Sequence, residues 1–300
     1  MKSILSIYWH VSLICTLGCS GNSDDSGKYL QQTPPAAVPE IFAPNLISRE
    51  GELEFGSVFS ADGTEFFYAV DRDGKAEIRY TRLENDGWST PSTLITHDLY
   101  SHNDPFLSPA EDELYYISNR PLKDGEGKKD YDIWYSVREN TGWSAPIHAG
   151  PEINSEGNEY YVSFTEDGTL YFSSNRGAEA GREHDYDIYA SSRKQGVFQQ
   201  PVRLSDSVNT PAYEADVFVA PDASYLIFCS VRQDGLGEGD LYISFKNERG
   251  DWAQAKNMRE LISSEHHELC PFVTRDGKYF LYTSNQDIYW VDATVLQRYR

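Results

Sequence analysis

Two sets of polar side chains recur along the chain at intervals of about fifty residues, and together they could form a binding or catalytic site. The first set contains Glu54, His102, Glu159, Glu214 and Glu268. The second set contains Arg72, Arg120, Arg176 and Arg232, with Gln286 at the fifth position. Carboxylate, imidazole and guanidinium groups that converge on one face can grip a polar ligand. A Glu and an Arg that recur in almost every repeat can equally form an ion pair that stabilises the repeat without any catalysis.

Three further markers keep the same period, so the chain is built from internal repeats. An acidic residue followed by an apolar one occurs at Glu77, Asp132, Asp187, Asp240 and Asp287, with steps of 55, 55, 53 and 47 residues. An aromatic residue after a Gly-containing turn occurs at Trp88, Trp143, Phe198 and Trp252. A turn occurs near Asp62, Glu111, Asp167, Asp222 and Asp276. Each repeat divides into four short strands separated by Gly, Asn and Asp turns, which is typical of a β-propeller blade.

These repeats predict an all-β fold, a single five-bladed β-propeller of four-stranded antiparallel blades over residues 40–300. The fifth repeat ends after its third strand, which begins at Asp287. The segment that begins at Ile41 matches the segments that begin at Trp88 and Phe198. We therefore expect this N-terminal strand to supply the missing fourth strand and to close the ring. Closure would remove the exposed edge that an open array of sheets carries.

Several segments resemble the TolB-type propeller repeat, a WD-repeat-like unit with a Pro-Asp-Gly turn. They read SADGTEFFYAV, SPAEDELYYISNR, TEDGTLYFSSNRG and TRDGKYFLYTSN. The resemblance extends over all five repeats and implies a propeller fold and a location in the bacterial envelope. The amino-terminal α/β domain of TolB has no counterpart in this sequence, so we expect a protein distinct from TolB itself. The resemblance implies no single activity.

The N-terminal residues have the pattern of a targeting segment. Residues 1–18 resemble a signal peptide, because Lys2 precedes an apolar stretch that is too short for a membrane span. Cys19 ends a sequence that resembles a bacterial lipobox, and an ordinary secretory signal that contains a Cys is the alternative. We expect residues 19–39 to form a polar, Pro-rich tether that is lipidated at Cys19. The expected location is the cell envelope, at the outer membrane, on its periplasmic side or at the cell surface.

The charge of the chain excludes several classes of partner. Lys and Arg number 26 against 47 Asp and Glu, which gives a formal net charge of −21. Nucleic-acid binding needs a clustered basic surface, and so does a broad electrostatic contact with anionic lipid. We therefore expect no nucleic-acid partner, membrane attachment through the lipid anchor only, and a monomer.

Both polar sets are expected on one face of the propeller, because the start of the first strand lies beside the end of the second in an antiparallel blade. The linkers between blades on this face are longer than the turns on the other face, and binding residues usually lie on such loops. We therefore predict that the Glu/His and Arg sets bind the ligand. Five tyrosines could offer flat surfaces to sugar rings or could pack between blades: Tyr100, Tyr131, Tyr160, Tyr186 and Tyr213.

Two functions from different classes fit these residues. The first is an envelope-anchored binding module that presents a polar face to a glycan, a peptide or a protein partner of the envelope. The second is a polysaccharide-active enzyme, a glycoside hydrolase or lyase, with Glu159 and Glu214 as the carboxylates and His102 as an accessory acid or base. Catalysis needs carboxylates with different pKa values, so the symmetry of the repeats favours binding.

No cofactor is expected from the motifs. The acidic, Gly-rich segments 124–130 and 234–240 do not follow the ligand order of an EF-hand. His102 and Glu268 are the residues that could hold a divalent cation at the mouth of the propeller. Cys229 and Cys270 could form a disulfide in an oxidising compartment or could remain two buried thiols.

Overall fold

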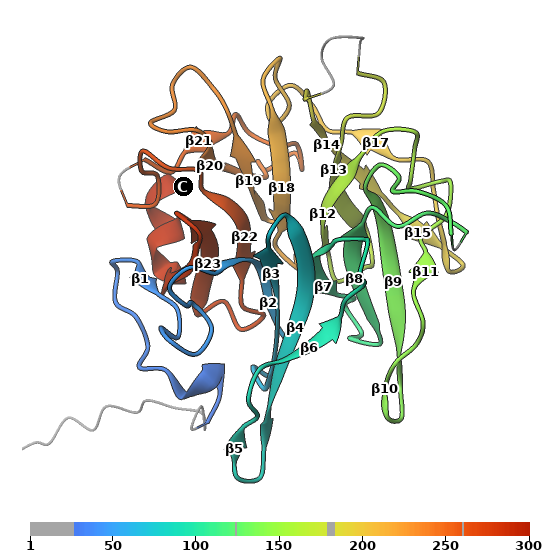
Figure 1. The fold of residues 1–300 in the computed structure, drawn as a ribbon. Coiled ribbons are helices and arrows are strands. Elements are labelled where there is room, and N and C mark those ends of the chain that lie inside the picture. The colour runs from blue at the N-terminus through green and yellow to red at the C-terminus, as the bar shows by residue number, and fades with distance from the viewer. Residues whose placement is uncertain (1–26, 124, 179–183, 260) are drawn as a thin grey trace, which may run out of the picture.

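The computed structural model describes residues 27–123, 125–178, 184–259 and 261–300, and its strands form a five-bladed β-propeller (Figure 1). This confirms the number of blades that the repeats predict. The first strand of each blade lies beside the central axis. In order of blades 1 to 5, these inner strands are β2 (Leu53–Phe59), β7 (His102–Leu107), β12 (Glu159–Phe164), β18 (Glu214–Val219) and β22 (Leu269–Val273).

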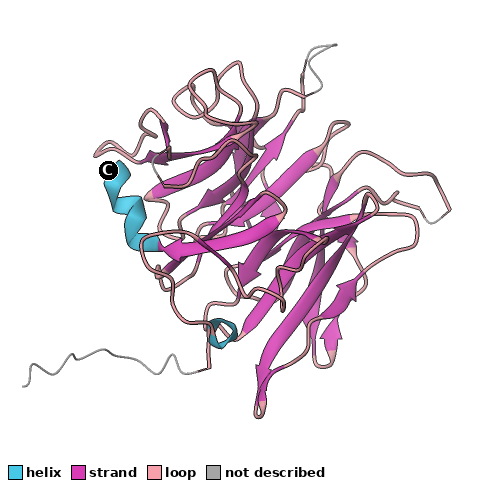
Figure 2. Cartoon of the chain, turned by 60° about the vertical axis from the view of Figure 1, so that its left-hand side comes forward, coloured by secondary structure: helices cyan, strands magenta, loops and turns pink. Residues whose placement is uncertain are grey.

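The second and third strands of each blade form a hairpin that extends away from the axis. Their apolar residues are buried on both sides because neighbouring blades cover both faces of each sheet. The second strands are β3 (Glu65–Arg72), β8 (Glu113–Ser118), β13 (Leu170–Ser174), β19 (Tyr225–Ser230) and β23 (Tyr279–Ser284). The third strands are β4 (Lys75–Glu84), β9 (Asp132–Glu139), β14 (Asp187–Ser191), β20 (Asp240–Phe245) and β24 (Asp287–Asp292). Strands make up almost all of the regular structure (Figure 2).

The fourth strands are short and lie at the outer edge. They are β6 (Ser92–Ile95), β11 (Ile147–His148), β17 (Val202–Arg203), β21 (Lys256–Asn257) and, in blade 5, β1 (Glu40–Ile41). The aromatic markers lie outside them, in hairpin arms that extend from the third strands. These arms contain β5 (Gly87–Trp88), β10 (Gly142–Trp143) and the pair of β15 (Arg193–Lys194) with β16 (Val197–Phe198). The markers therefore stabilise the hairpin arms, as when the Arg138 guanidinium stacks 4.4 Å from the Trp143 ring centre.

The N-terminal strand closes the ring, as the sequence predicts. Strand β1 pairs with β24, where Ile41 lies opposite Tyr289. The register differs from the expected one, because Ile41 takes the place of Arg203, opposite Tyr189, rather than that of Phe198. The next residue, Phe42, is fully buried, and its ring centre lies 5.1 Å from that of Trp290. Apolar contacts therefore reinforce the backbone pairing at the closure.

The two faces of the propeller differ. We call the face where the inner strands begin the linker face, and the face with the hairpin arms the hairpin face (Figure 1, where β5 and β10 project downward). The first described residues pack on the hairpin face, in a short helix η1 (Tyr29–Gln31). The Tyr29 hydroxyl donates to the Asp276 carboxylate at 2.8 Å, and the Tyr29 amide donates to the carbonyl of Gly63. Part of the expected tether 19–39 therefore packs on the propeller.

The C-terminal segment also packs on the body of the protein. A 3₁₀ helix, η2 (Ala293–Tyr299), follows β24 and buries Val295 and Leu296. No helix in the described part of the chain is long and apolar enough to cross a membrane. The expected signal peptide 1–18 and the lipidation site Cys19 lie outside the described residues.

Candidate ligand-binding face

The aligned carboxylates lie at the start of the inner strands on the linker face, as expected, but they are buried. Glu159 is fully buried and accepts hydrogen bonds from the amide and hydroxyl of Ser155 and from the hydroxyl of Ser174. The Arg176 guanidinium lies 3.1 Å from the same carboxylate. Burial raises the pKa of Glu159, and these hydrogen bonds and Arg176 oppose the increase. The carboxylate therefore ties the incoming linker to its own blade.

Blade 4 repeats this arrangement. Glu214 accepts from the amide and hydroxyl of Thr210 and pairs with Arg232 at 3.1 Å. The guanidinium of Arg232 also stacks over the Tyr242 ring, 4.5 Å from its centre. In blades 3 and 4 the aligned Glu and Arg thus form an ion pair within the blade. This is one of the two roles that the sequence allowed, the other being ligand binding.

The remaining blades depart from this pattern. Glu268 keeps the hydrogen bonds from Ser264 and Ser284, while Gln286 stands where an Arg would lie. Glu54 accepts a hydrogen bond from the amide of Arg49, and its second carboxylate oxygen is buried without a hydrogen-bond partner among the described residues. Burial raises the pKa of Glu54 to about 7, and the negative charges of Asp287 and Glu52 add to this increase. Arg72 pairs with Glu52 rather than with Glu54.

Blade 2 carries His102 in place of the carboxylate. Its ring is buried, and its Nδ1 atom has no hydrogen-bond partner. Burial, together with the positive charge of Arg120, lowers the pKa of His102 to about 4, so the imidazole is neutral at pH 7. Arg120 stacks over the Trp134 ring at 4.8 Å.

Five further residues meet at the propeller axis, two positions after the aligned Glu/His set, and sequence reasoning missed them. Each lies at a bulge of its inner strand and has a positive φ angle between 47° and 55°. They are Gly56, Asp104, Tyr161, Asp216 and Cys270. The residue type changes from blade to blade, so no recurrence marks the position. The available signal was two aspartates that directly precede the apolar halves of their strands.

The axial residues form a buried polar layer. Burial and the charge of Asp216 raise the pKa of Asp104 to about 8, and burial raises that of Asp216 to about 6. The Tyr161 hydroxyl donates to the carbonyl of Pro271 at 2.8 Å, which joins blade 3 to blade 5. Below this layer, the rings of Phe106 and Phe218 lie within 6.0 Å of that of Phe272. Aromatic packing therefore closes the axis toward the hairpin face.

The expected tyrosines form a continuous row on the linker face. The ring centres of Tyr131 and Tyr160 lie 5.2 Å apart, those of Tyr160 and Tyr186 5.4 Å, and those of Tyr186 and Tyr213 5.5 Å. The rings thus pack on one another across blades 2 to 4, which is one of the two roles expected. Tyr100 lies apart from this row and stacks on His97 at 4.4 Å.

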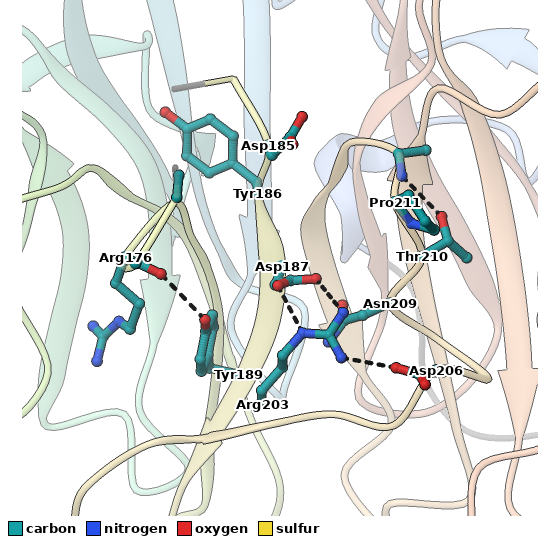
Figure 3. A pocket seen from close by; sticks show the side chains of 13 residues that line it. Arg176, Asp185, Tyr186, Asp187, Tyr189, Arg203, Asp206, Asn209, Thr210 and Pro211 are labelled. Carbon is teal, nitrogen blue, oxygen red and sulfur yellow. Dashed lines mark hydrogen bonds and ion pairs between the residues drawn. The ribbon is translucent and has the colours of Figure 1, made fainter. Parts of the chain in front are cut away.

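Beside Tyr186 of this row, a cleft opens on the linker face of blade 3. We call it the blade-3 cleft. Its volume is about 620 Å³, which is in the range of small-molecule sites. Tyr186 and Tyr189 form part of its wall, and the segment from Arg203 to Ala212 forms the other side. Figure 3 shows the Arg203 guanidinium held between Asp187 and Asp206, at 2.7 Å and 3.0 Å. The Tyr189 hydroxyl lies near the carbonyl of Arg176 in the same view.

The charges of the blade-3 cleft nearly cancel. Its described lining residues include two guanidinium groups, those of Arg176 and Arg203, and three carboxylates, those of Asp185, Asp187 and Asp206. The ion pair of Arg203 with Asp187 also fixes the side chains in place, because two bonds join the guanidinium to one carboxylate. The cleft therefore offers fixed donors, fixed acceptors and aromatic rings without a strong net charge.

Contacts also define the roles of two linker asparagines and of the two cysteines. The Asn154 side chain pairs with both the amide and the carbonyl of Ile133, and Asn209 does the same at Ile188. These linker asparagines hold the backbone rather than face solvent. Cys229 and Cys270 are both buried free thiols, so they form no disulfide with each other. Within the described residues, no group of three or more His, Cys, Asp or Glu is placed to hold a metal ion.

The fold is similar to that of solved propeller proteins. TolB from Acinetobacter baumannii matches with a TM-score of 0.50 and 13% identity, over 79% of this chain and 53% of TolB. This chain thus spans about half the length of TolB. A thermostable family-43 glycoside hydrolase matches with a TM-score of 0.52 and 12% identity, over 82% of this chain and 90% of that protein.

No family model and no curated protein matches the sequence. The structural likeness supports the TolB-like propeller fold that the repeats predict. At 12–13% identity it extends to the fold alone, because one fold hosts many unrelated functions.

Proposed function

We propose that the protein is an envelope-anchored binding module that holds a glycan in the blade-3 cleft. The observation that carries this proposal is the combination, in one cleft, of the Tyr186 and Tyr189 rings with the fixed Arg203–Asp187 pair. Aromatic faces cover the apolar sides of sugar rings, and fixed polar groups bond to their hydroxyls. The near-neutral lining and the net charge of −21 favour a neutral glycan over a polyanion.

The enzyme alternative receives less support from the site. A glycosidase needs two accessible carboxylates that flank the scissile bond. Glu159 and Glu214 are fully buried, and each is engaged by an Arg and by hydroxyl groups. His102 lies in blade 2 and is also buried. These side chains are therefore better suited to holding the blades than to contacting a polymer.

Binding can be tested with a chain that starts at Ser20 and so keeps every described residue. We expect retardation by neutral polysaccharides in affinity electrophoresis and loss of this retardation in Tyr189→Ala. Tyr289→Ala is the matched control, because Tyr289 occupies the same position in blade 5, outside the cleft. Equal loss in both variants, or no retardation by any neutral or acidic polysaccharide, would contradict the proposal. Released fragments would instead favour the enzyme.

The envelope location is a separate part of the proposal. It rests on the lipobox-like sequence that ends at Cys19. When the full chain is expressed in a bacterium with labelled palmitate, we expect the label to be incorporated and the Cys19→Ser variant to remain unlabelled. An unlabelled native chain that is nevertheless secreted would show that residues 1–18 act as an ordinary signal.

A further inference from the structure

A second cavity opens on the linker face, between the inner strands of blades 5 and 1, and shares no lining residue with the blade-3 cleft. We call it the blade-5 cavity, and its volume is about 260 Å³. Leu53 and Phe55 of β2 and Leu269 of β22 form its apolar wall. Side chains alternate along a strand, so the buried Glu54 points away from this wall.

A tight turn of blade 5 forms another side of the cavity. In blade 3, residues 175–186 connect the second and third strands, whereas in blade 5 only Asn285 and Gln286 do so. Their φ angles are 48° and 75°, as a two-residue hairpin turn requires. Both residues line the cavity. Gln286 aligns with Arg176 and Arg232, so a neutral amide stands in this wall where blades 3 and 4 have a guanidinium.

The described lining of the cavity contains one carboxylate, that of Glu238, and no lysine or arginine. Glu238 lies between two glycines that closely approach the linker to blade 5. A Cβ atom at Gly237 would overlap the carbonyl oxygen of His266, and one at Gly239 would lie 2.6 Å from the His267 ring. Gly239 also forms a β-bridge with His267. These contacts fix the backbone on both sides of Glu238 and keep its carboxylate at the cavity.

The surroundings of the cavity add no positive charge to its wall. Glu268 is fully buried between His267 and Leu269, which both line the cavity. Glu159 and Glu214 each pair with an Arg of their own blade, and among the described residues Glu268 has no such ion pair. Burial lowers the pKa of His267, so its imidazole is neutral at pH 7. The charge of Glu238 is therefore not balanced within the wall.

We propose that the blade-5 cavity binds a small primary amine, in its ammonium form, with a short apolar body. The ammonium group has three N–H donors, and the Glu238 carboxylate and the amide oxygens of Asn285 and Gln286 can accept from them. The body lies against Phe55 and Leu269. An organic cation fits better than a metal ion, because no group of three or more His, Cys, Asp or Glu in the described part of the chain is placed to hold one.

The probe is 2-phenylethylamine, and 2-phenylethanol is its neutral control, each titrated calorimetrically at pH 7 into the chain that starts at Ser20. We expect the amine to bind at least about tenfold more tightly than the alcohol, because only the ammonium group forms a charged pair with Glu238. Equal affinities, or no heat from the amine up to about 20 mM, would overturn the proposal. The result is independent of the glycan test, because the two sites share no residue.

Glu238→Gln tests whether this carboxylate holds the amine. The variant removes the charge and keeps the shape of the side chain, so the amine should bind at least about tenfold more weakly while the alcohol is unaffected. Glu248→Gln is the matched control, because Glu248 is exposed in the same blade and outside the cavity. An unchanged affinity in Glu238→Gln, or an equal loss in both variants, would contradict the proposal. Circular dichroism establishes that both variants are folded.

An added positive charge provides the converse test. Gln286→Arg places a guanidinium in the cavity wall, as in blades 3 and 4, so the amine should bind at least about tenfold more weakly. Gln297→Arg adds the same charge at an exposed position of η2 outside the cavity and should keep the affinity. Equal affinities in the two variants would show that charge at the cavity does not govern binding and would overturn the proposal.

Discussion

The Cys270 thiol of blade 5 donates to the carboxylate of Asp104 of blade 2 at 3.5 Å, across the axis of the propeller. Blade 1 lies between these two blades in the ring, and it carries Gly56 at the same axial position. The absence of a side chain there lets Asp104 approach the backbone of blade 1 closely. The axis is thus packed by side chains of different size and polarity, each of which fits the space that its neighbours leave.

Gly56→Ala should destabilise the protein by about 2–4 kcal/mol. A Cβ atom at this position would lie 2.6 Å from the Oδ1 atom and 2.8 Å from the Cα atom of Asp104, and the φ angle is +55°. Urea unfolding measures the change. Gly74→Ala is the control, because its φ is +75° with nothing within 4 Å, so it should cost only about 1 kcal/mol. Equal costs would show that the axial contact is unimportant.

Stability should decrease as the pH rises from 6.5 to 8. The folded-state pKa of Asp104 is about 8, above its ordinary value of 3.8. The contribution of its protonated form to the free energy of unfolding is therefore full below about pH 4, decreases as the pH rises and is lost by about pH 8. Glu54, with a pKa of about 7, acts in the same direction. We expect a loss of about 1–2 kcal/mol across this range in urea unfolding.

The Asp104→Asn variant identifies the group responsible for this pH dependence. It cannot ionise, so its unfolding free energy should change less between pH 6.5 and 8. Asp86→Asn, at an exposed turn, should leave the slope of the native protein unchanged. A native stability that rises over this range would show that Asp104 is ionised at the axis.

Glu159→Gln should destabilise the protein by about 3 kcal/mol, because it leaves the Arg176 guanidinium without its ion-pair partner. Glu268→Gln is the matched control. Glu268 has the same serine hydrogen bonds, but Gln286 replaces the Arg, so the loss should be clearly smaller. Thermal unfolding compares the two. If both variants lose the same stability, the ion pair contributes nothing beyond the hydrogen bonds.

Phe42→Ala should destabilise the ring by about 3–5 kcal/mol. Phe42 is fully buried beside β1, and its ring packs against those of Phe66 and Trp290. Val38→Ala, at a side chain that is 64% exposed, should change little. Chemical unfolding checks both. An intact stability in Phe42→Ala would mean that backbone pairing alone closes the propeller.

The number of blades and the closing strand could be predicted because both depend on the period of the repeat. The fourth strands could not be placed. Trp88 and the short β6 that follows both pair with β4, and an alternating pattern does not distinguish a hairpin arm from an edge strand. The register predicted for Ile41 was therefore wrong, although the prediction that this segment pairs with the third strand of blade 5 was correct.

The candidate site was only partly predictable for a related reason. Recurrence identified Glu159 and Arg176 and placed them on one face, but recurrence marks the residues that hold each blade together. Asp104 and Asp216 do not recur in every blade, and their burial depends on bulges that bring five strands to one axis. The shape of the blade-3 cleft depends on the paths of the linkers, which the sequence pattern does not specify.

The packing of Tyr29 against Gly63 and Asp276 has a consequence for orientation. It holds the start of the described chain on the hairpin face (Figure 1), whereas the residues that line the blade-3 cleft lie on the linker face. If Cys19 carries the proposed lipid, the hairpin face is the side turned toward the bilayer. The blade-3 cleft then points outward into the surrounding compartment, where a polymer can reach it without passing between the protein and the membrane.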